Sequence, residues 1–383
     1  MDGLLQDTTW TGDGAIERLP EAVVELGASS VLLVCGRSSF DASGAARVLP
    51  ALEAVVPVTR FSDFRPNTDA RDVAVGLQVL ADTGADTLVA VGGGSALDLA
   101  KLLCGFADTP PAELDAAIAA GPTITARRHR LVLAPTTSGS GAETTHFAVV
   151  YLGDDKHSIA GPAMLPDRIL LDPQLTLSAS AYQRATSGID AVAQAIEGLW
   201  AVGASDDSRR FSRAALPPLL DAIEPYVNDG DAEAARQMAL GSHLAGRSID
   251  VSKTTAAHAL SYGITKGYGR SHGHAVATSL GPFLAAQAAA TPDRLQPGVD
   301  PAAHAEVVAE VLELLGASDG PDAHVRFAAL AGRIGLDPRL SVTGADDAAA
   351  RAALAAKVNP ERLGNDPVVF DRDDLVAILT AAG

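Results

Sequence analysis

The sequence contains few aromatic residues, few cysteines and comparatively few basic residues. Aromatic residues make up 4% of its 383 residues, so a buried core must consist mainly of alanine, leucine and valine. Two cysteines, Cys35 and Cys104, cannot form a disulfide framework, and nothing in the sequence requires an oxidising compartment. Asp and Glu (47) outnumber Lys and Arg (29), which gives a formal charge of −18. Such a surface repels phosphate backbones, so we expect no nucleic-acid partner.

Long hydrophobic runs are also missing. No apolar run reaches the roughly 18 residues of a membrane-spanning helix, and the first twenty residues show no basic start followed by an apolar stretch. We therefore expect no membrane partner, no signal peptide and a cytoplasmic location. At about 150 residues per domain, the length predicts two to three domains.

The first half of the chain alternates short apolar runs with helix-like segments. Continuous apolar strands that alternate with helices predict an α/β fold with a parallel sheet covered on both faces. The expected strands are 30–35, 56–61, 87–91, 131–134 and 169–171, and the expected helices between them are 44–53, 69–81 and 95–106.

After about residue 177, alanine- and leucine-rich stretches at helical spacing dominate the sequence, which predicts an all-α second part. We expect two domains, 1–178 and 179–383. The expected helices of the second domain are 181–202, 208–225, 231–249, 252–264, 273–290, 302–315 and 322–334.

Three glycines, Gly92, Gly93 and Gly94, follow an expected strand and open an expected helix. Glycines at a helix N-terminus let main-chain N–H groups approach an anion closely, and Ser95 is expected to cap the helix. This pattern fits a pyrophosphate-binding loop, but a flexible strand-to-helix turn would have the same composition.

A second loop, PTTSGSGAET at 135–144, also follows an expected strand. Parallel sheets bind ligands at the carboxyl ends of their strands, and the hydroxyls of Thr136, Thr137 and Ser138 suit a nucleotide. A Ser/Gly-rich linker is the alternative interpretation.

Carboxylate, amide and imidazole side chains gather in the second half. Asp190 and Gln194 are four residues apart on an expected helix and share one face, while His258, His272 and His274 follow later. Carboxylate and imidazole together suit a catalytic divalent ion such as Zn²⁺ or Fe²⁺. The alternative is that these are ordinary surface or core histidines.

Taken together, these segments resemble the iron-containing (group III) alcohol dehydrogenase family. The resemblance covers nearly the whole chain, and five segments in the same order carry it. They are GGGSALDLAK (92–101), PTTSGSGAETT (135–145), DAVAQAIEGLW (190–200), HALSYGITKGYGRSHGHAVA (258–277) and NPERLGNDP (359–367).

The resemblance implies a Rossmann-like N-terminal domain and an all-helical C-terminal domain, a fold shared with dehydroquinate synthase. It places the family's divalent metal ligands on Asp190, Gln194, His258 and His272. Gln194 departs from the histidine of most members, and its amide oxygen is a weaker ligand that prefers harder ions. His274 is a catalytic or substrate-pocket candidate and, with His146, a candidate proton donor. Tyr262 stands where many members carry a second histidine.

Within the family, the sequence resembles the phosphonoacetaldehyde reductases, which form 2-hydroxyethylphosphonate in phosphonate natural-product pathways. That resemblance implies a small, phosphonate-bearing aldehyde as substrate, and an acidic protein then needs local cations to bind it. The candidate substrate residues are Lys253, Thr254, Arg270 and His146. Alternatively, Lys253 and Arg270 pair with surface carboxylates.

The first strand ends without a carboxylate at Gly36-Arg37-Ser38, where Arg37 and the neighbouring serine suit a 2′-phosphate. We therefore expect NADPH to be accepted, with NADH not excluded. The remaining cofactor contacts that the resemblance implies are Asn67, Gly93, Gly94, Ser95, Asp98, Thr136, Thr137, Ser138 and Lys156.

Four other functions remain open from the sequence. They are a dehydrogenase of the same family for an uncharged aldehyde or alcohol, a metal-independent relative resembling maleylacetate reductase, a dehydroquinate-synthase-like lyase, and a nucleotide-binding module without catalysis. The resemblance also implies a homo-oligomer, with a dimer as the expected state.

Overall fold

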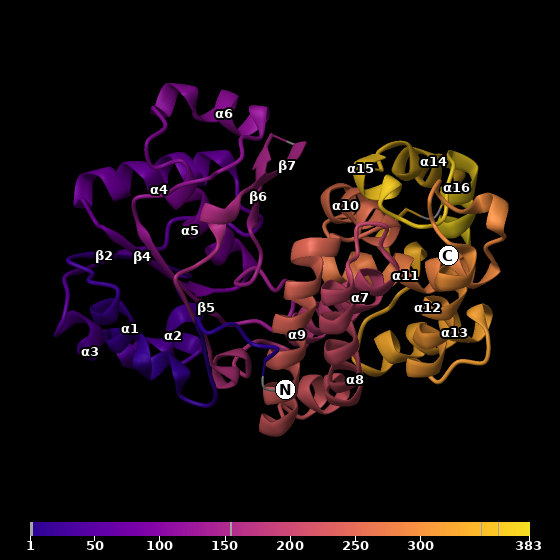
Figure 1. Ribbon diagram of the computed structural model, residues 1–383, viewed down its shortest axis with the longest axis horizontal. Coiled ribbons are helices and arrows are strands. Elements are labelled where there is room, and N and C mark those ends of the chain that lie inside the picture. The colour runs from indigo at the N-terminus through magenta and orange to yellow at the C-terminus, as the bar shows by residue number, and fades with distance from the viewer. Residues whose placement is uncertain (1–2, 154, 346, 359) are drawn as a thin grey trace. The chain divides into compact units, whose positions relative to one another are not determined.

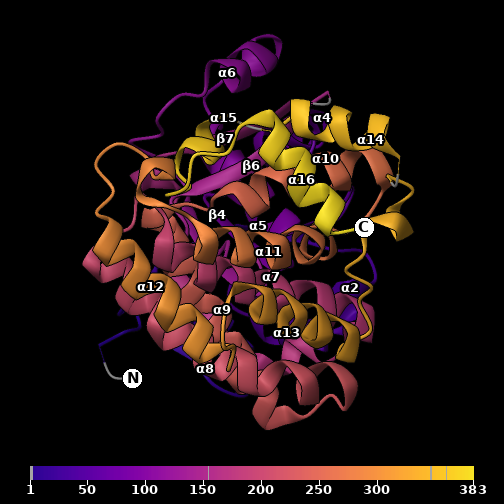
Figure 2. The same ribbon diagram turned by 90° about the vertical axis from the view of Figure 1, so that its right-hand side faces the viewer.

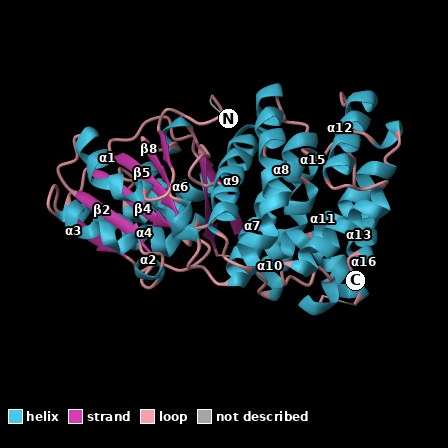
Figure 3. Cartoon of the chain, turned by 90° about the horizontal axis from the view of Figure 1, so that it is seen from below, coloured by secondary structure: helices cyan, strands magenta, loops and turns pink. Residues whose placement is uncertain are grey.

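The computed structural model of the protein describes residues 3–153, 155–345, 347–358 and 360–383 (Figure 1). Its internal contacts separate Met1–Ser180, here called unit 1, from Ala181–Gly383, here called unit 2. Strands occur in unit 1, and the described part of unit 2 is built from helices (Figure 3). This confirms the expected fold class, with an α/β first part and an all-α second part.

Unit 1 is built on a six-stranded sheet in which all neighbouring strands are parallel, in the order β1-β8-β5-β4-β2-β3. The strands are β1 (Thr9–Thr11), β2 (Val31–Cys35), β3 (Val58–Phe61), β4 (Thr87–Gly92), β5 (Arg130–Pro135) and β8 (Arg168–Leu171). A separate antiparallel hairpin, β6 (Phe147–Leu152) and β7 (Asp155–Ala160), was not expected from the sequence.

The sheet is covered on both faces because successive residues of its apolar strands point to opposite sides. Leu32, Leu88 and Leu131 pack in one core cluster with α4 (Ala70–Thr83) and α5 (Gly94–Gly105). Their chain neighbours in β2, β4 and β5 pack in a second cluster with α1 (Leu19–Glu25) and α3 (Leu49–Glu53). The remaining helices of unit 1 are α2 (Ser39–Ala42) and α6 (Leu114–Ala120).

Unit 2 is organised around α7 (Ala181–Trp200), which contacts α8, α9, α11 and α12 (Figure 2). Between Ala185 and Trp200, every residue of α7 except Ser187 is buried. A helix that is buried all round is a core helix, so polar side chains on it need partners inside the unit. The other helices are α8 (Asp206–Asn228), α9 (Ala232–Ser252), α10 (Ala256–Tyr268), α11 (His272–Ala289), α12 (Pro301–Leu314), α13 (Gly320–Arg333), α14 (Ala348–Ala356), α15 (Pro360–Gly364) and α16 (Arg372–Ala381).

Several helices of unit 2 begin with a side-chain cap, although α10 and α11 do not. Ser205 and Ser208 form a capping box at α8, and Asp231 accepts from the main-chain N–H of Ala234 at α9. Asn359, the first residue of the closing motif, lies outside the described residues. Among the described residues, no helix has the length and apolar character needed to cross a membrane.

Candidate active site

The loops that follow β2, β4 and β5 leave the sheet of unit 1 at the same edge. Cys35 lies opposite Val91 in the β2–β4 register, and Val91 lies opposite Ala134 in the β4–β5 register. The segments 36–38, 93–95 and 136–138 therefore begin side by side. Carboxyl ends of neighbouring parallel strands are where open α/β sheets bind ligands.

The glycine loop and the 136–141 loop pack against each other. A Cβ atom on Gly94 would lie 2.8 Å from Ser140 Oγ, and one on Gly93 would lie 3.4 Å from the Thr137 side chain. Ser138 Oγ is buried and has no hydrogen-bond partner in the described part of the chain. The side-chain-free loop and the unsatisfied hydroxyl fit the polar groups of a nucleotide.

Ser95 does not cap α5, so that prediction was wrong. The helix begins at Gly94 with Gly93 as its N-cap, and no side-chain cap is present there. Ser95 Oγ instead accepts a hydrogen bond from the main-chain N–H of Asn67 at 3.0 Å. Asn67 has a positive φ of 61°, a conformation that asparagine adopts more readily than most residues. This contact ties the segment before α4 to the start of α5.

Asp98 lies inside unit 1. Its carboxylate accepts from the main-chain N–H of Val149 at 3.1 Å, which joins α5 to β6. Burial raises the pKa of Asp98 to about 6, against the opposing effect of the Lys101 and Lys156 ammonium groups. Lys156 lies on β7 opposite Tyr151. The two predicted cofactor residues Asp98 and Lys156 are therefore close enough to interact electrostatically.

Arg37 meets a carboxylate that the sequence does not place next to it. Its guanidinium lies 2.5 Å from Asp63 Oδ1, just after β3, and both side chains are largely exposed. Gly36 packs closely against Ser39 at this turn, since a Cβ there would lie 2.1 Å from Ser39 Oγ and require that hydroxyl to move. Ser38 is the N-cap residue of α2 without a side-chain hydrogen bond.

In unit 2, the side chains of Asp190, His258 and His272 converge. One ligand atom from each lies within 4.8 Å of the others, and α7, α10 and α11 supply one residue each. His258 Nε2 lies 3.2 Å from Asp190 Oδ1, and His272 Nε2 lies 3.8 Å from the same oxygen. Ligand atoms about 2.1 Å from a divalent ion would be roughly 3.0 to 3.4 Å apart. The separation between His258 and Asp190 lies in this range, and His272 would have to move slightly closer to Asp190 to bind the same ion.

A close approach of α11 to α7 positions His272. A Cβ on Gly273 would lie only 1.8 Å from the Thr186 carbonyl oxygen and 3.1 Å from Asp190 Cβ. Only glycine allows this approach, and His272 precedes it directly. The His-Gly pair therefore places the first residue of α11 at the carboxylate of α7.

Glu197 contacts the ring nitrogen of His258 that does not face Asp190. It is fully buried on α7, and its Oε1 accepts from the Thr255 main-chain N–H (2.9 Å) and hydroxyl (2.7 Å). Its other oxygen contacts His258 Nδ1. A histidine that donates from Nδ1 to a carboxylate presents a free Nε2 to a metal, as second-shell partners commonly arrange.

The cluster favours a positive charge at its centre. Burial opposes protonation of His258, but the carboxylates of Glu197 and Asp190 outweigh it and raise the pKa of His258 to about 10. Two buried carboxylates that face one imidazole thus attract a cation. Glu197 was not among the site residues predicted from the sequence, although its spacing from Asp190 and Gln194 places it on the same face of α7.

Tyr262 packs against His272, whereas His274 has other partners. The Tyr262 ring stacks on His272 with centroids 5.7 Å apart and an interplanar angle of 21°. The two His274 ring nitrogens face the Tyr182 hydroxyl (3.2 Å) and the Asp337 carbonyl (2.8 Å). As a proton donor, the role predicted for it, His274 would have to break one of these bonds.

The predicted substrate residues fall into both units. Lys253 ends α9 with a positive φ of 59°, and its Nζ donates to the Asp250 carbonyl at 3.1 Å. Thr254 is buried next to it, and Arg270 donates to the Val342 carbonyl. His146 lies in unit 1, where its carbonyl accepts from Gly161 N–H. Three of the four predicted substrate residues thus belong to unit 2, and the fourth belongs to unit 1.

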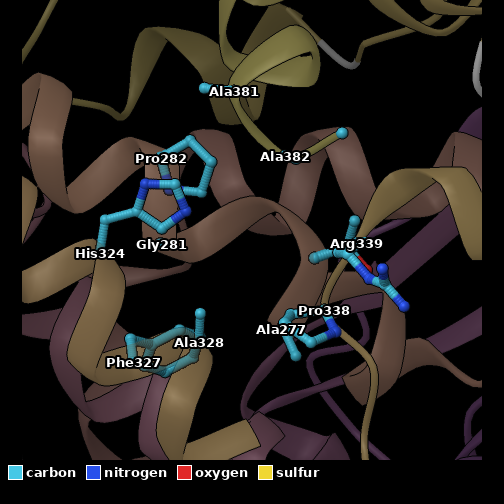
Figure 4. Close-up of a pocket in the computed structure, with 12 residues that line it drawn as sticks. Ala277, Gly281, Pro282, His324, Phe327, Ala328, Pro338, Arg339, Ala381 and Ala382 are labelled. Atoms are coloured by element: carbon cyan, nitrogen blue, oxygen red, sulfur yellow. The ribbon is translucent and has the colours of Figure 1, made fainter. Parts of the chain in front are cut away.

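Unit 2 also contains a small pocket away from the cluster residues. It is lined by residues of α11, α13 and the C-terminal end of α16, with His324 and Arg339 on different sides (Figure 4). Its lining is mostly small or apolar and includes none of Asp190, His258 and His272. The pocket therefore does not coincide with the metal-ligand candidates.

A parallel sheet with open loops, followed by a helical unit with a carboxylate–imidazole cluster, defines the class of two-part, metal-binding dehydrogenases. Residues 7–173 match the family model described as iron-containing alcohol dehydrogenase, and residues 184–383 match the C-terminal model of the same family. The chain therefore belongs to the iron-containing alcohol dehydrogenase family and is an oxidoreductase. This confirms the resemblance inferred from its sequence motifs.

Three relatives show the range of substrates among similar proteins. The chain is 34% identical to phosphonoacetaldehyde reductase of Streptomyces viridochromogenes over 268 residues, 67% of each chain. It is also 34% identical to choline dehydrogenase of Bacillus subtilis over 278 residues, 71% of this chain and 69% of that one. The sulfoacetaldehyde reductase of Bifidobacterium kashiwanohense, solved in complex with NAD⁺, is 26% identical with a TM-score of 0.86, covering 98% of this chain and 96% of that chain.

Proposed function

We propose that the protein is a divalent-metal-dependent reductase that uses NADPH or NADH to convert phosphonoacetaldehyde to 2-hydroxyethylphosphonate. The observation that supports the reductase chemistry is the convergence of Asp190, His258 and His272 in unit 2. In the balanced reaction, the carbonyl carbon gains a hydride from the reduced nicotinamide and the oxygen gains a proton. The proposed role of this reaction is in phosphonate natural-product biosynthesis.

Each unit has a separate task in this proposal. Asp190, His258 and His272 hold the ion, and Glu197 keeps His258 in the tautomer that presents Nε2. The loops 93–95 and 136–138 hold the nucleotide through main-chain N–H groups and hydroxyls. When bound, the ion supplies Lewis-acid chemistry and the nicotinamide supplies the hydride.

Lys253 supports the choice of an anionic substrate. It lies two residues before Thr255, whose hydroxyl and N–H bind the same Glu197 carboxylate that contacts His258. Asn365 donates to the carbonyls of Ser252 (2.8 Å) and Thr254 (3.0 Å) and thereby holds the segment in which Lys253 has its positive φ. A rigid lysine linked in this way to the metal-ligand candidates suits a phosphonate.

Arg270 is the second basic residue that lies close in sequence to a metal-ligand candidate. It precedes His272 by two residues, and its side chain donates to a neutral main-chain carbonyl, which does not cancel its charge. Two of the relatives described above are named for aldehydes with an anionic phosphonate or sulfonate group. The two basic residues, Lys253 and Arg270, and the names of these two relatives favour an aldehyde that carries a strongly acidic group.

A substrate panel tests the proposal. Oxidation of NADPH and of NADH is followed with phosphonoacetaldehyde, sulfoacetaldehyde, propanal and betaine aldehyde, using metal-loaded protein. We expect kcat/KM for phosphonoacetaldehyde to exceed that for propanal by at least about tenfold, the effect of one charge-assisted hydrogen bond. Equal or better turnover of propanal would remove the phosphonate proposal.

Variants that lack one of the two basic side chains test whether those side chains bind the substrate's anionic group. Lys253→Ala and Arg270→Ala should each raise KM for phosphonoacetaldehyde by roughly 10- to 100-fold and leave propanal turnover nearly unchanged. Lys266→Ala on α10 is the matched control, because it removes a lysine that is not assigned to the substrate. A parallel loss with both aldehydes would show that the two cations act on the fold.

A second candidate is a dehydrogenase for choline or a similar alcohol, favoured by the 34% identity to choline dehydrogenase. In that case betaine aldehyde outperforms both acidic aldehydes in the panel. The dimeric state and the cytoplasmic location also remain proposals, which light scattering and cell fractionation test directly.

A further inference from the structure

The pocket of Figure 4 lies where short side chains of α11 face α13 and the C-terminal end of α16. Ala277 and Gly281 are four residues apart on α11 and share one face of it. His324 and Ala328 share one face of α13 in the same way. A Cβ on Gly281 would lie 2.6 Å from the His324 ring, so the two helices approach closely at this point. The short side chains around this contact leave a cavity of about 130 Å³.

His324 is the polar group that this pocket offers to a ligand. Its ring nitrogens form no hydrogen bond within the described part of the chain, and burial lowers its pKa below the ordinary value of about 6.5. The ring is therefore neutral at pH 7, with one N–H donor and one nitrogen acceptor. Thr278, which also lines the pocket, already donates its hydroxyl hydrogen to the His274 carbonyl at 3.1 Å.

Arg339 does not make the pocket cationic. Its Nε and Nη2 donate to the two Asp337 oxygens at 2.9 and 2.6 Å, and this pairing lowers the pKa of Asp337 to about 2. The carboxylate therefore compensates the guanidinium charge. Much of the remaining lining consists of alanine methyl groups and the rings of Pro282, Pro338 and Phe327. Such a lining favours an uncharged, largely apolar ligand, because a charged group would lose its hydration without gaining a partner.

We propose that this pocket binds a small uncharged molecule with one apolar ring and one hydroxyl group, of the size of phenol. The ring packs against the alanine and proline side chains, and the hydroxyl, which can donate or accept, pairs with His324. An apolar cavity of about 150 Å³ is known to hold benzene, so a cavity of about 130 Å³ suits a single ring. The site is separate from the metal-ligand candidates, none of which lines it, and does not depend on the proposed function.

Alanine methyl resonances locate and quantify the binding. Phenol, toluene and benzoate are titrated into protein with isotope-labelled alanine methyl groups and added Zn²⁺. Phenol should shift the signals of Ala277, Ala328 and Ala381, which line the pocket. Benzoate has a similar ring but carries a charge, so its dissociation constant should exceed that of phenol by about tenfold or more.

Two variants test the two halves of the ligand. Ala328→Phe fills the pocket and should weaken phenol binding by at least about tenfold. Ala329→Phe is the matched control, because it adds the same volume at the next residue of α13, which is exposed and does not line the pocket. His324→Phe keeps a flat ring without nitrogens, so the affinity for phenol should fall about 3- to 10-fold relative to that for toluene.

The location of the bound phenol decides the proposal. Phenol affinity should be the same in Zn²⁺-loaded and metal-free protein, and loss of binding on metal removal would place phenol at the metal-ligand candidates and overturn the proposal. Equal phenol affinity in Ala328→Phe and the wild type, or tighter binding of benzoate than of phenol, would also overturn it. The benzoate comparison and His324→Phe keep the proposal falsifiable if Ala328→Phe folds poorly.

Discussion

In unit 1, the groups available to a cofactor are main-chain N–H groups and hydroxyls of loops 93–95 and 136–138. In unit 2, the groups available to a metal are the buried side chains of Asp190, His258 and His272 on three helices. In the proposed cofactor site, glycine at 94 leaves space, whereas in the proposed metal site hydrogen bonds such as those of Glu197 fix side-chain orientation. The first site should therefore respond to added volume, and the second to lost charge or lost hydrogen bonds.

Removing a metal ligand should have the largest effect. In His272→Ala, metal affinity should fall by more than the roughly 100-fold that loss of an outer-shell partner costs, and turnover should be lost with it. Binding of NADH, measured by fluorescence, should stay within about twofold if the two sites are built independently. His157→Ala in the β6–β7 hairpin is the control. A variant that keeps both metal and turnover would end the ligand assignment.

Added side-chain volume in the glycine loop should weaken binding of the nicotinamide cofactor rather than of the metal. A Cβ on Gly94 would lie 2.8 Å from Ser140 Oγ, so Gly94→Val should weaken NADH binding by about 5- to 150-fold, as overpacking by roughly 1 to 3 kcal/mol implies. Metal affinity should not change. Gly267→Ala is the matched control, since a Cβ there meets nothing within 4 Å. A similar loss of metal affinity would contradict the prediction that added volume affects only the cofactor site.

Glu197 tests whether orientation matters in unit 2. Glu197→Gln keeps the volume but removes the charge that faces His258 Nδ1, so metal affinity should fall by about 10- to 100-fold. Chelator competition measures this change. Glu310→Gln, at an exposed ion pair with Arg213, is the control. Equal metal affinity in the Glu197 variant and the wild type would show that Asp190, His258 and His272 need no support.

The Arg37–Asp63 pair should set the cofactor preference, with a smaller effect because both side chains are largely exposed. Arg37→Ala should lower kcat/KM for NADPH by roughly fivefold relative to NADH, and Asp63→Ala should raise it, since the 2′-phosphate then no longer competes with a carboxylate. Initial rates with both cofactors measure the ratio. Strict NADH dependence in the wild type and in Asp63→Ala would contradict the predicted acceptance of NADPH.

The remaining prediction concerns the pH dependence of stability, which Asp366 should influence. Its carboxylate accepts from Gln287 Nε2 (2.7 Å), Val368 N–H and Ala256 N–H, while Gln287 also bonds to His304. Burial raises the pKa of Asp366 to about 7, with a further contribution from Glu197, and burial lowers the pKa of His304.

The folded protein therefore holds a proton on Asp366 that the unfolded chain loses near pH 4. Between about pH 4 and 7 the folded state binds more protons, so stability falls as pH rises, by up to about 1.4 kcal/mol per pH unit. In Asp366→Asn the contribution of this group to the slope should disappear. Melting temperatures of both proteins from pH 5 to 8 check it, and a constant difference between them would refute the raised pKa.

Much of unit 1 could be predicted because its strands and the loops that follow them are contiguous in the sequence. The apolar runs that became β2, β4 and β5 and the loops after them are contiguous in sequence, and the alternation of strands and helices predicts the sheet. The hairpin β6–β7 was missed because its second strand, DKHSIA, is mostly polar and does not show a buried-strand pattern. The Arg37–Asp63 pair was missed because its partners follow different strands.

Unit 2 was harder to predict because its site depends on packing between helices. Asp190 and Gln194 share one face by spacing alone, and the structure shows them hydrogen-bonded. The convergence of His258 and His272 on that face depends on Gly273, which lets α11 approach α7, and no spacing rule contains this contact. Residue type and spacing made these side chains candidates for a metal site, and the family resemblance assigned them as ligands, but neither identified Glu197.

The most direct test is stoichiometric reconstitution of metal-stripped protein. NADPH or NADH oxidation with phosphonoacetaldehyde is measured while Fe²⁺, Zn²⁺ or Mn²⁺ is added in fractions of an equivalent. The account predicts negligible activity without metal and a linear rise that saturates near one ion per chain. Full activity in verified metal-free protein would contradict a metal site at Asp190, His258 and His272 as the basis of this reductase.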